Sequence, residues 1–286
     1  FVIGNGADSD NRSDALVVKF NGDATLAGSM TATSFIGDGS QLTNLPSSGA
    51  DSPFSYNSNE AGGIEIADYT TASGSRAFAV GTDSQASGFG STAMGRGTIA
   101  SGDDSTALGA NTEASGIGST AMGVNTTASG PESTAMGWQT TASGGWSTAM
   151  GDITIASGEN STAMGYNSTA SGIGSTAVGI STTASGDGST AMGGYTTASG
   201  DGSTAMGGYT TASDYASVAI GQYNNSLSSV TTNGSATAYD TDNTAFVIGN
   251  GTESDNRSDA LVVKFNGDTT LAGSITATSF IGDGSQ

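Results

Sequence analysis

Neither cysteine nor histidine occurs in the 286-residue sequence. Their absence excludes cysteine nucleophiles, Ser-His-Asp triads, disulfides, iron–sulfur clusters and the usual zinc sites. Proline occurs only three times, and no apolar run approaches the roughly 20 residues of a membrane-spanning helix. We therefore expect no enzyme, no cofactor, no metal site and no membrane insertion of this chain.

Positive charge is also scarce. The sequence has 6 Lys and Arg against 26 Asp and Glu, for a formal net charge of −20. Such an acidic surface disfavours nucleic acid as a partner, because the phosphate backbone would be repelled. The charge is typical of a soluble surface, and it is also compatible with a basic or cationic partner.

Glycine, by contrast, is abundant, with 46 residues. The hydrophobic set makes up only 35% of the chain, which is too little for a thick core, while Ser, Thr and Ala are frequent. Low charge and few prolines, together with many β-branched residues, argue against disorder. The composition favours an all-β fold of short stacked strands joined by tight turns.

A 14-residue repeat organises the middle of the chain. Its unit reads approximately xxTTASGxxSTAMG, and eleven copies follow one another without insertion between residues 68 and 221. The repeated glycine closing each unit falls at Gly81, Gly95, Gly109, Gly123, Gly137, Gly151, Gly165, Gly179, Gly193, Gly207 and Gly221. Two short runs closed by glycine in each unit predict a parallel β-solenoid with one unit per coil.

Strand alternation sorts the side chains of each coil onto two faces. Thr92 and Met94 share one face, and Ser91 and Ala93 share the other. The position of Met94 is apolar in every copy, so we expect that column to be buried. The position of Ala93 is always alanine, which indicates close approach of either the opposite strand or another chain.

A 14-residue coil encloses too little interior to be stable alone, and we infer that several chains share one core. The residues expected to pack in the core or between chains are Ala93, Met94, Ala121, Met122, Ala149, Met150, Val218 and Ile220.

A second, longer repeat encloses the first. Residues 1–41 match residues 246–286 at an offset of 245, with only four differences. The parent protein is therefore expected to be a tandem array. We divide the chain into a first β flank (1–46), a connector (47–67), the solenoid (68–221), a second connector (222–245) and a second β flank (246–286).

The string ASVAIG at residues 216–221 resembles the repeat signature of trimeric autotransporter adhesin heads of the YadA type. STAMG and AFAVG are looser versions of it, with Met at the usual Ile position and Thr at the usual Val position. The resemblance implies a left-handed parallel β-roll, a homotrimer and an extracellular location. The flank strings NGDATLAG and SFIGDGSQLTNL resemble segments of phage tail fibres and bacterial surface fibres.

Aromatic residues fall at the variable corners between runs and should face solvent. The candidates for binding host or matrix glycans or proteins are Trp138, Trp146, Tyr166, Tyr195 and Tyr209. Alternatively, these rings pack along the solenoid or against a neighbouring chain. The carboxylates of Asp8, Asp10 and Asp23 could meet on a threefold axis and hold a cation there.

The expected function is that of a structural module in a long trimeric extracellular fibre, serving as stalk and adhesive surface. A phage tail-fibre segment is one alternative, on a virion instead of a cell. An ice-binding β-solenoid is another, because a Thr or Ser occupies the position of Thr98 in every copy and could form an exposed ladder.

Overall fold

The computed structural model describes residues 2–4, 14–21, 23–26, 55–56, 64–66, 69–225 and 234–279. All the regular elements in these ranges are β-strands. The chain divides into two compact units, Phe1–Gly49 and Ala50–Gln286.

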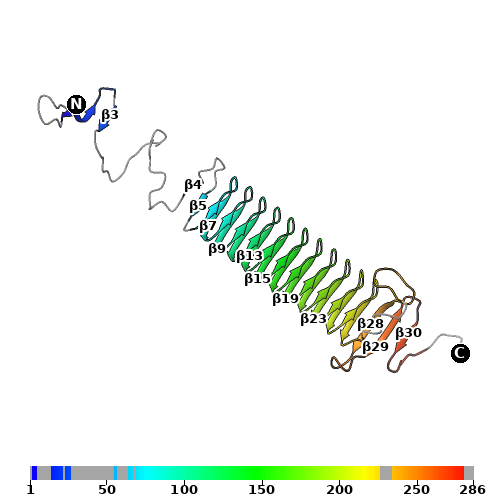
Figure 1. Cartoon of the computed structure of the whole chain (residues 1–286). Helices are drawn as coiled ribbons and strands as arrows, with labels where there is room; N and C mark the ends of the chain where they lie inside the picture. The colour runs from blue at the N-terminus through cyan, green and yellow to red at the C-terminus, as the bar shows by residue number, and fades with distance from the viewer. Residues whose placement is uncertain are drawn as a thin grey trace. The chain divides into compact units, whose positions relative to one another are not determined.

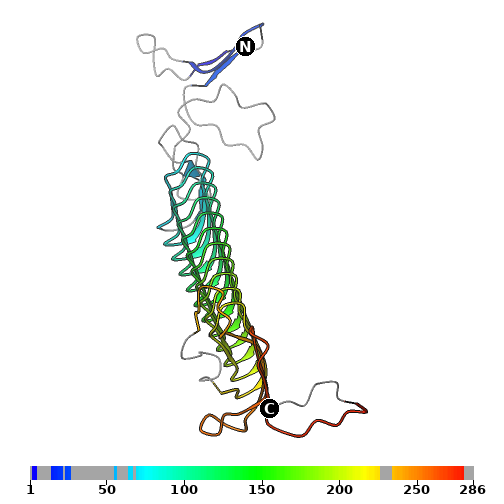
Figure 2. The same cartoon turned by 90° about the vertical axis from the view of Figure 1, so that its right-hand side faces the viewer.

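The larger unit contains a rod of stacked coils, each made of one longer and one shorter strand (Figures 1 and 2). The longer strands are β7 (Phe78–Thr82), β9 (Thr92–Arg96), β11 (Thr106–Ala110), β13 (Thr120–Val124), β15 (Thr134–Trp138), β17 (Thr148–Asp152), β19 (Thr162–Tyr166), β21 (Thr176–Ile180), β23 (Thr190–Gly194), β25 (Thr204–Gly208) and β27 (Val218–Gln222). The shorter strands are β6 (Thr71–Ala72), β8 (Gln85–Ala86), β10 (Ile99–Ala100), β12 (Glu113–Ala114), β14 (Thr127–Ala128), β16 (Thr141–Ala142), β18 (Ile155–Ala156), β20 (Thr169–Ala170), β22 (Thr183–Ala184), β24 (Thr197–Ala198) and β26 (Thr211–Ala212).

These strands form two parallel sheets, one of long strands and one of short strands. Each residue pairs with the residue 14 positions further along, as Ala135 does with Ala149 and Thr127 with Thr141. The predicted all-β parallel solenoid with one repeat per coil is confirmed.

Further strands extend the long-strand sheet at both ends of the rod. At the start, β4 (Ser55–Tyr56) pairs antiparallel with β5 (Ile64–Ile66), which pairs parallel with β7. At the other end, β28 (Thr244–Asn250) pairs parallel with β27, and β29 (Asp259–Lys264) and β30 (Thr269–Leu271) follow antiparallel. The second flank copy is thus a three-stranded meander hydrogen-bonded directly to the last coil.

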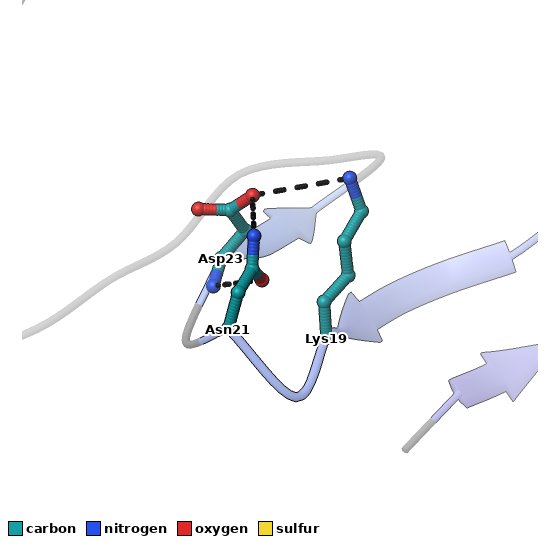
Figure 3. A network of polar contacts seen from close by, with 3 residues as sticks. All are labelled: Lys19, Asn21 and Asp23. Carbon is teal, nitrogen blue, oxygen red and sulfur yellow. Dashed lines mark hydrogen bonds and ion pairs between the residues drawn. The ribbon is translucent and has the colours of Figure 1, made fainter.

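The smaller unit holds the same kind of meander, formed by β1 (Val2–Gly4), β2 (Asp14–Val18) and β3 (Ala24–Leu26). Its β2–β3 turn is closed by Asn21, whose Nδ2 donates to Asp23 Oδ2 at 2.8 Å and whose Oδ1 accepts from the Asp23 N–H at 3.1 Å (Figure 3). Lys19 Nζ lies 3.9 Å from the same carboxylate. Asn266 and Asp268 repeat this arrangement in the second copy.

The core of the rod lies inside the coil and consists of small side chains. Ala93 of the long strand and Ala100 of the short strand have no exposed surface, nor do their equivalents in the other coils. Ser and Thr hydroxyls complete the interior; for example, Thr98 Oγ1 donates to Ser84 Oγ at 3.0 Å, and Ser91 Oγ to the Gly88 carbonyl at 2.8 Å.

Two glycine columns let neighbouring coils approach this closely. At Gly151, with φ +123°, an added Cβ would lie 2.1 Å from the carbonyl oxygen of Gly165 in the next coil. At Gly116, in the other column, it would lie 2.1 Å from the Gly130 carbonyl oxygen. Real Cβ atoms do not come this close to an oxygen, so coil stacking itself requires glycine at both columns.

Candidate functional site

The outer face of the long-strand sheet carries the Met94 column. Because Ala93 points into the coil, its neighbours Thr92 and Met94 point outward. In the single chain Met94 is 40% exposed and Met192 is 38% exposed, and the other nine members of the column are partly buried. The prediction that this column is buried is therefore wrong for one chain, since the coil encloses only its alternate residues. The result is an apolar stripe along the surface of the rod.

The other residues predicted to pack fall on both sides of the sheet. Ala93, Ala121 and Ala149 are fully buried inside their own coils, so the opposite strand accounts for their small size. Met122, Met150, Val218 and Ile220 lie on the outer face and are half-buried.

The Thr98 column lies inside the coil, not on its surface. The Thr and Ser side chains of this column from residue 84 to residue 210 are at most 1% exposed. Adjacent Thr residues in each TT pair point in opposite directions, so the first is internal and the second external. The ice-binding hypothesis required this ladder to be exposed, and the structure overturns that premise.

Four of the five aromatic candidates are exposed at the corners, as predicted. Trp138, Trp146, Tyr166 and Tyr195 are between 43% and 58% exposed. Trp138 and Tyr166 occupy the same corner two coils apart, with Asp152 between them. These aromatic rings are about half exposed and are held on a stiff rod. They are suited to stacking against a sugar or to anchoring a protein partner.

Tyr209, the fifth candidate, belongs to a stack that runs along the rod. Its ring centroid lies 4.5 Å from that of Tyr195 and 4.4 Å from that of Tyr223, with the planes almost parallel. Desolvation within the stack raises the pKa of the Tyr209 phenol, and the charge of Tyr223 and a hydrogen bond with it add to the effect. Packing along the rod, the alternative interpretation of the aromatics, applies to this group.

Two residues that sequence reasoning missed close the end of the rod. Asp214 stands in the column of Gly116 and Gly200, and its Oδ2 accepts from the Thr244 N–H at 2.7 Å. Asn224 stands in the column of Thr98, and its side chain bonds to the backbone of β26. The only signal in the sequence is that Asp214 breaks the glycine column and Asn224 breaks the Ser/Thr column, and it does not show what either side chain contacts.

The acidic corner residues have structural partners in the neighbouring coil. Asp103 Oδ1 accepts from the Phe89 N–H at 2.9 Å, and Asp187 Oδ1 from the Ile173 N–H at 2.8 Å. Within the described ranges, no group of three His, Cys, Asp or Glu residues is placed to hold a metal ion. Asp8 and Asp10 lie outside those ranges. The same ranges contain no helix long and apolar enough to cross a membrane.

The sequence of the coils matches a known family. The model of the YadA head domain repeat matches residues 86–112, 114–140, 128–152, 142–168, 170–196 and 198–224. A comparison with curated proteins finds no match. The family model holds two copies of the repeat, and each matched segment accordingly spans about two of the 14-residue coils. Residues 86–224 are thus a YadA-like head, built from repeats of this family.

Proposed function

We propose that this chain is a module of a long, tandemly repeated extracellular fibre, in which three chains pack together through the outer faces of their long-strand sheets. The observation that carries the proposal is the half-exposed Met94 column. It is apolar in every coil and continues from Val80 to Ile220. On a strongly acidic protein, an apolar surface stripe of this kind supports the proposal that another chain packs against this face.

Three such stripes meeting around an axis would form the thick core that a single coil lacks. Methionine suits this position because its flexible, polarizable side chain fills irregular gaps between chains. The resulting fibre would be stiff, and the acidic corners would keep neighbouring fibres apart.

The fibre acts as stalk and adhesive surface at the outside of a cell. The exposed rings of Trp138, Trp146 and Tyr166 supply contacts for host or matrix glycans or proteins. A phage tail fibre is the second candidate, supported by the flank strings that resemble such fibres; it uses the same trimer on a virion.

The lateral packing is tested by placing charge on the apolar stripe. Replacing both Met136 and Met150 by Glu brings six carboxylates into the shared core, and the chain should sediment as a monomer of 27.8 kDa. The matched control replaces Thr127 and Thr141 by Glu on the outer face of the short-strand sheet, where Glu113 already stands in the same column. The control should leave the oligomer intact, and dissociation of both variants alike would contradict the proposal.

A further inference from the structure

Trp138 and Tyr166 lie in the rod with one coil between them. Trp138 pairs with Asp152, and Asp152 pairs with Tyr166, so the three residues occupy the same corner of three successive coils. Coils stack about 4.8 Å apart, which places the backbones of the two aromatic residues about 9.6 Å apart. Both rings are nearly half exposed. The two rings therefore flank a smaller, charged residue at the surface of the rod.

The tyrosine stack in the adjacent corner column shows what a ring in the middle coil does. Tyr195, Tyr209 and Tyr223 also occupy three successive coils, and their ring centroids are 4.5 Å and 4.4 Å apart. The middle ring thus fills the space between the outer two. Asp152 stands at the middle position of its own group, and its short side chain leaves the thickness of one flat group between the two aromatic residues.

The carboxylate of Asp152 is not neutralised by the rod. Its Oδ1 atom is covered by protein and has no hydrogen-bond partner among the described residues. The basic residue of the same column, Arg96, lies four coils and about 19 Å away, and the sequence has no Lys or Arg from there to Arg257. A charge at that distance is screened, because the Debye length in physiological salt is about 8 Å. A partly covered carboxylate without a partner is unfavourable and favours a cation from outside the chain.

The composition of this corner column places it outside the lateral contact proposed above. The column includes Arg96, Asp152 and Gln222, whereas the Met94 column is apolar in every coil. The corner therefore lies at the rim of the shared core, where water reaches it. A neighbouring chain at the same level supplies no cation either, because residues 97–222 contain no Lys or Arg. The missing cation belongs to a different molecule.

We infer that Trp138, Asp152 and Tyr166 form a binding site for the side chain of an arginine on a basic partner protein. A guanidinium group is flat, stacks on aromatic faces and donates a pair of parallel hydrogen bonds to a carboxylate. A neutral sugar would also stack on the rings, but it would leave the charge of Asp152 unpaired. The net charge of −20 attracts basic proteins to the rod. The inference rests on the proposed adhesive role and names the chemical group that the adhesive surface recognises.

The test follows Trp138 in the full chain during titration with tetra-arginine. The chain has two tryptophans, so fluorine NMR of fluorotryptophan-labelled protein gives one signal for each, and Trp138→Ala identifies the signal of Trp138. Tetra-arginine should shift this signal, whereas the same peptide made of citrulline, a neutral isostere of arginine, should not.

Two substitutions of Asp152 separate charge from space. The column already holds residues as different as Ala110 and Ile180, so both variants should stay folded. Asp152→Asn should weaken tetra-arginine binding by at least about tenfold, because the charged hydrogen-bond acceptor is lost. Asp152→Tyr should abolish the binding, because the new ring fills the gap as Tyr209 does in its own stack.

Glu113→Gln is the matched control, because it removes the same charge from an exposed position on the short-strand sheet. It should change the affinity for tetra-arginine by less than about twofold, as for an isolated surface charge. Equal weakening by Asp152→Asn and Glu113→Gln would overturn the inference, since it would reveal attraction to the acidic surface alone. So would an equal shift with the citrulline peptide. A shift with a β-linked glucose oligomer in place of tetra-arginine would also overturn it and would identify a sugar-binding surface.

The arginine site and the proposed function fail separately. The three residues belong to one chain, so a monomer in sedimentation would remove the shared core and leave the binding of tetra-arginine in place. Conversely, adhesion that depends on Trp138 but not on Asp152 would retain the adhesive surface and overturn the arginine site.

Discussion

The side-chain amide of Asn224 pairs with the backbone of Thr211 in both directions. The Thr211 N–H donates to Asn224 Oδ1 at 2.7 Å, and Asn224 Nδ2 donates to the Thr211 carbonyl oxygen at 2.9 Å. Thr211 belongs to β26, the last strand of the short-strand sheet. The amide therefore occupies the edge where another strand would otherwise pair, which closes this sheet.

Asn224→Thr should expose that edge. The substitution restores the usual residue of the column and removes both hydrogen bonds, leaving the N–H and C=O of the partly buried Thr211 without these partners. We expect a loss of about 1–3 kcal/mol of local stability, measured by hydrogen exchange at the Thr211 amide. Thr182→Ser is the control, because Ser84 and Ser168 already occupy this column. Unchanged protection of Thr211 would show that the Asn224 amide does not close the edge.

Gly151→Ala should unfold the coils around it. The new methyl group would lie 2.1 Å from the Gly165 carbonyl oxygen, at a φ of +123° that alanine rarely adopts. We expect more than about 4 kcal/mol of destabilisation in urea unfolding, as for other severe backbone conflicts. Gly194→Ala is the matched control, since nothing lies within 4 Å of an added Cβ there. Equal losses for the two variants would refute the stacking argument.

Ile153→Asn should stabilise the rod. Ile153 is a β-branched residue held at φ 55°, in the left-handed region. Asn111, Asn125 and Asn167 occupy the same corner column with similar φ values, and Asn111 Nδ2 donates to Asn125 Oδ1 at 3.2 Å. We expect a gain of about 1 kcal/mol in free energy of unfolding, because asparagine tolerates this conformation. A lower thermal midpoint would contradict this account of the corner.

Much of the fold follows from the sequence because the repeat fixes both the coil and its alternation. The 14-residue step predicts the register of the strands, and the prediction that Ser91 and Ala93 lie on the same face is correct. It is harder to predict which face of the long strands lines the interior of the coil. Met94 is more apolar than Ala93, which favours it as the core residue, but a 14-residue coil has room only for small side chains, so methionine lies outside.

The closing residues of the rod escape prediction for a different reason. In the sequence, Asp214 and Asn224 look like ordinary variation within an imperfect repeat. Their role depends on their contacts: Asp214 binds the backbone of Thr244, 30 residues away, and Asn224 binds the backbone of Thr211, 13 residues away. The same holds for the Tyr195–Tyr209–Tyr223 stack. Its rings come together only because equivalent corners of successive coils are superimposed.

Trp138→Ala should leave the rod folded and reduce adhesion. The indole is 43% exposed and contributes little to the core, whereas it offers a rigid surface to a ligand. We expect unchanged circular dichroism and at least about tenfold weaker attachment to immobilised glycans or matrix proteins. Ile180→Ala, an exposed aliphatic residue of the same corner column, is the control. Adhesion equal to that of wild type would remove Trp138 from the binding surface.

The most direct measurement of the central claim is the mass of the wild-type chain by sedimentation equilibrium. Three chains packed through their Met94 columns predict a species of three times 27.8 kDa that persists on dilution. A folded monomer of 27.8 kDa, with its methionine stripe in contact with water, would contradict the shared core and the fibre built on it.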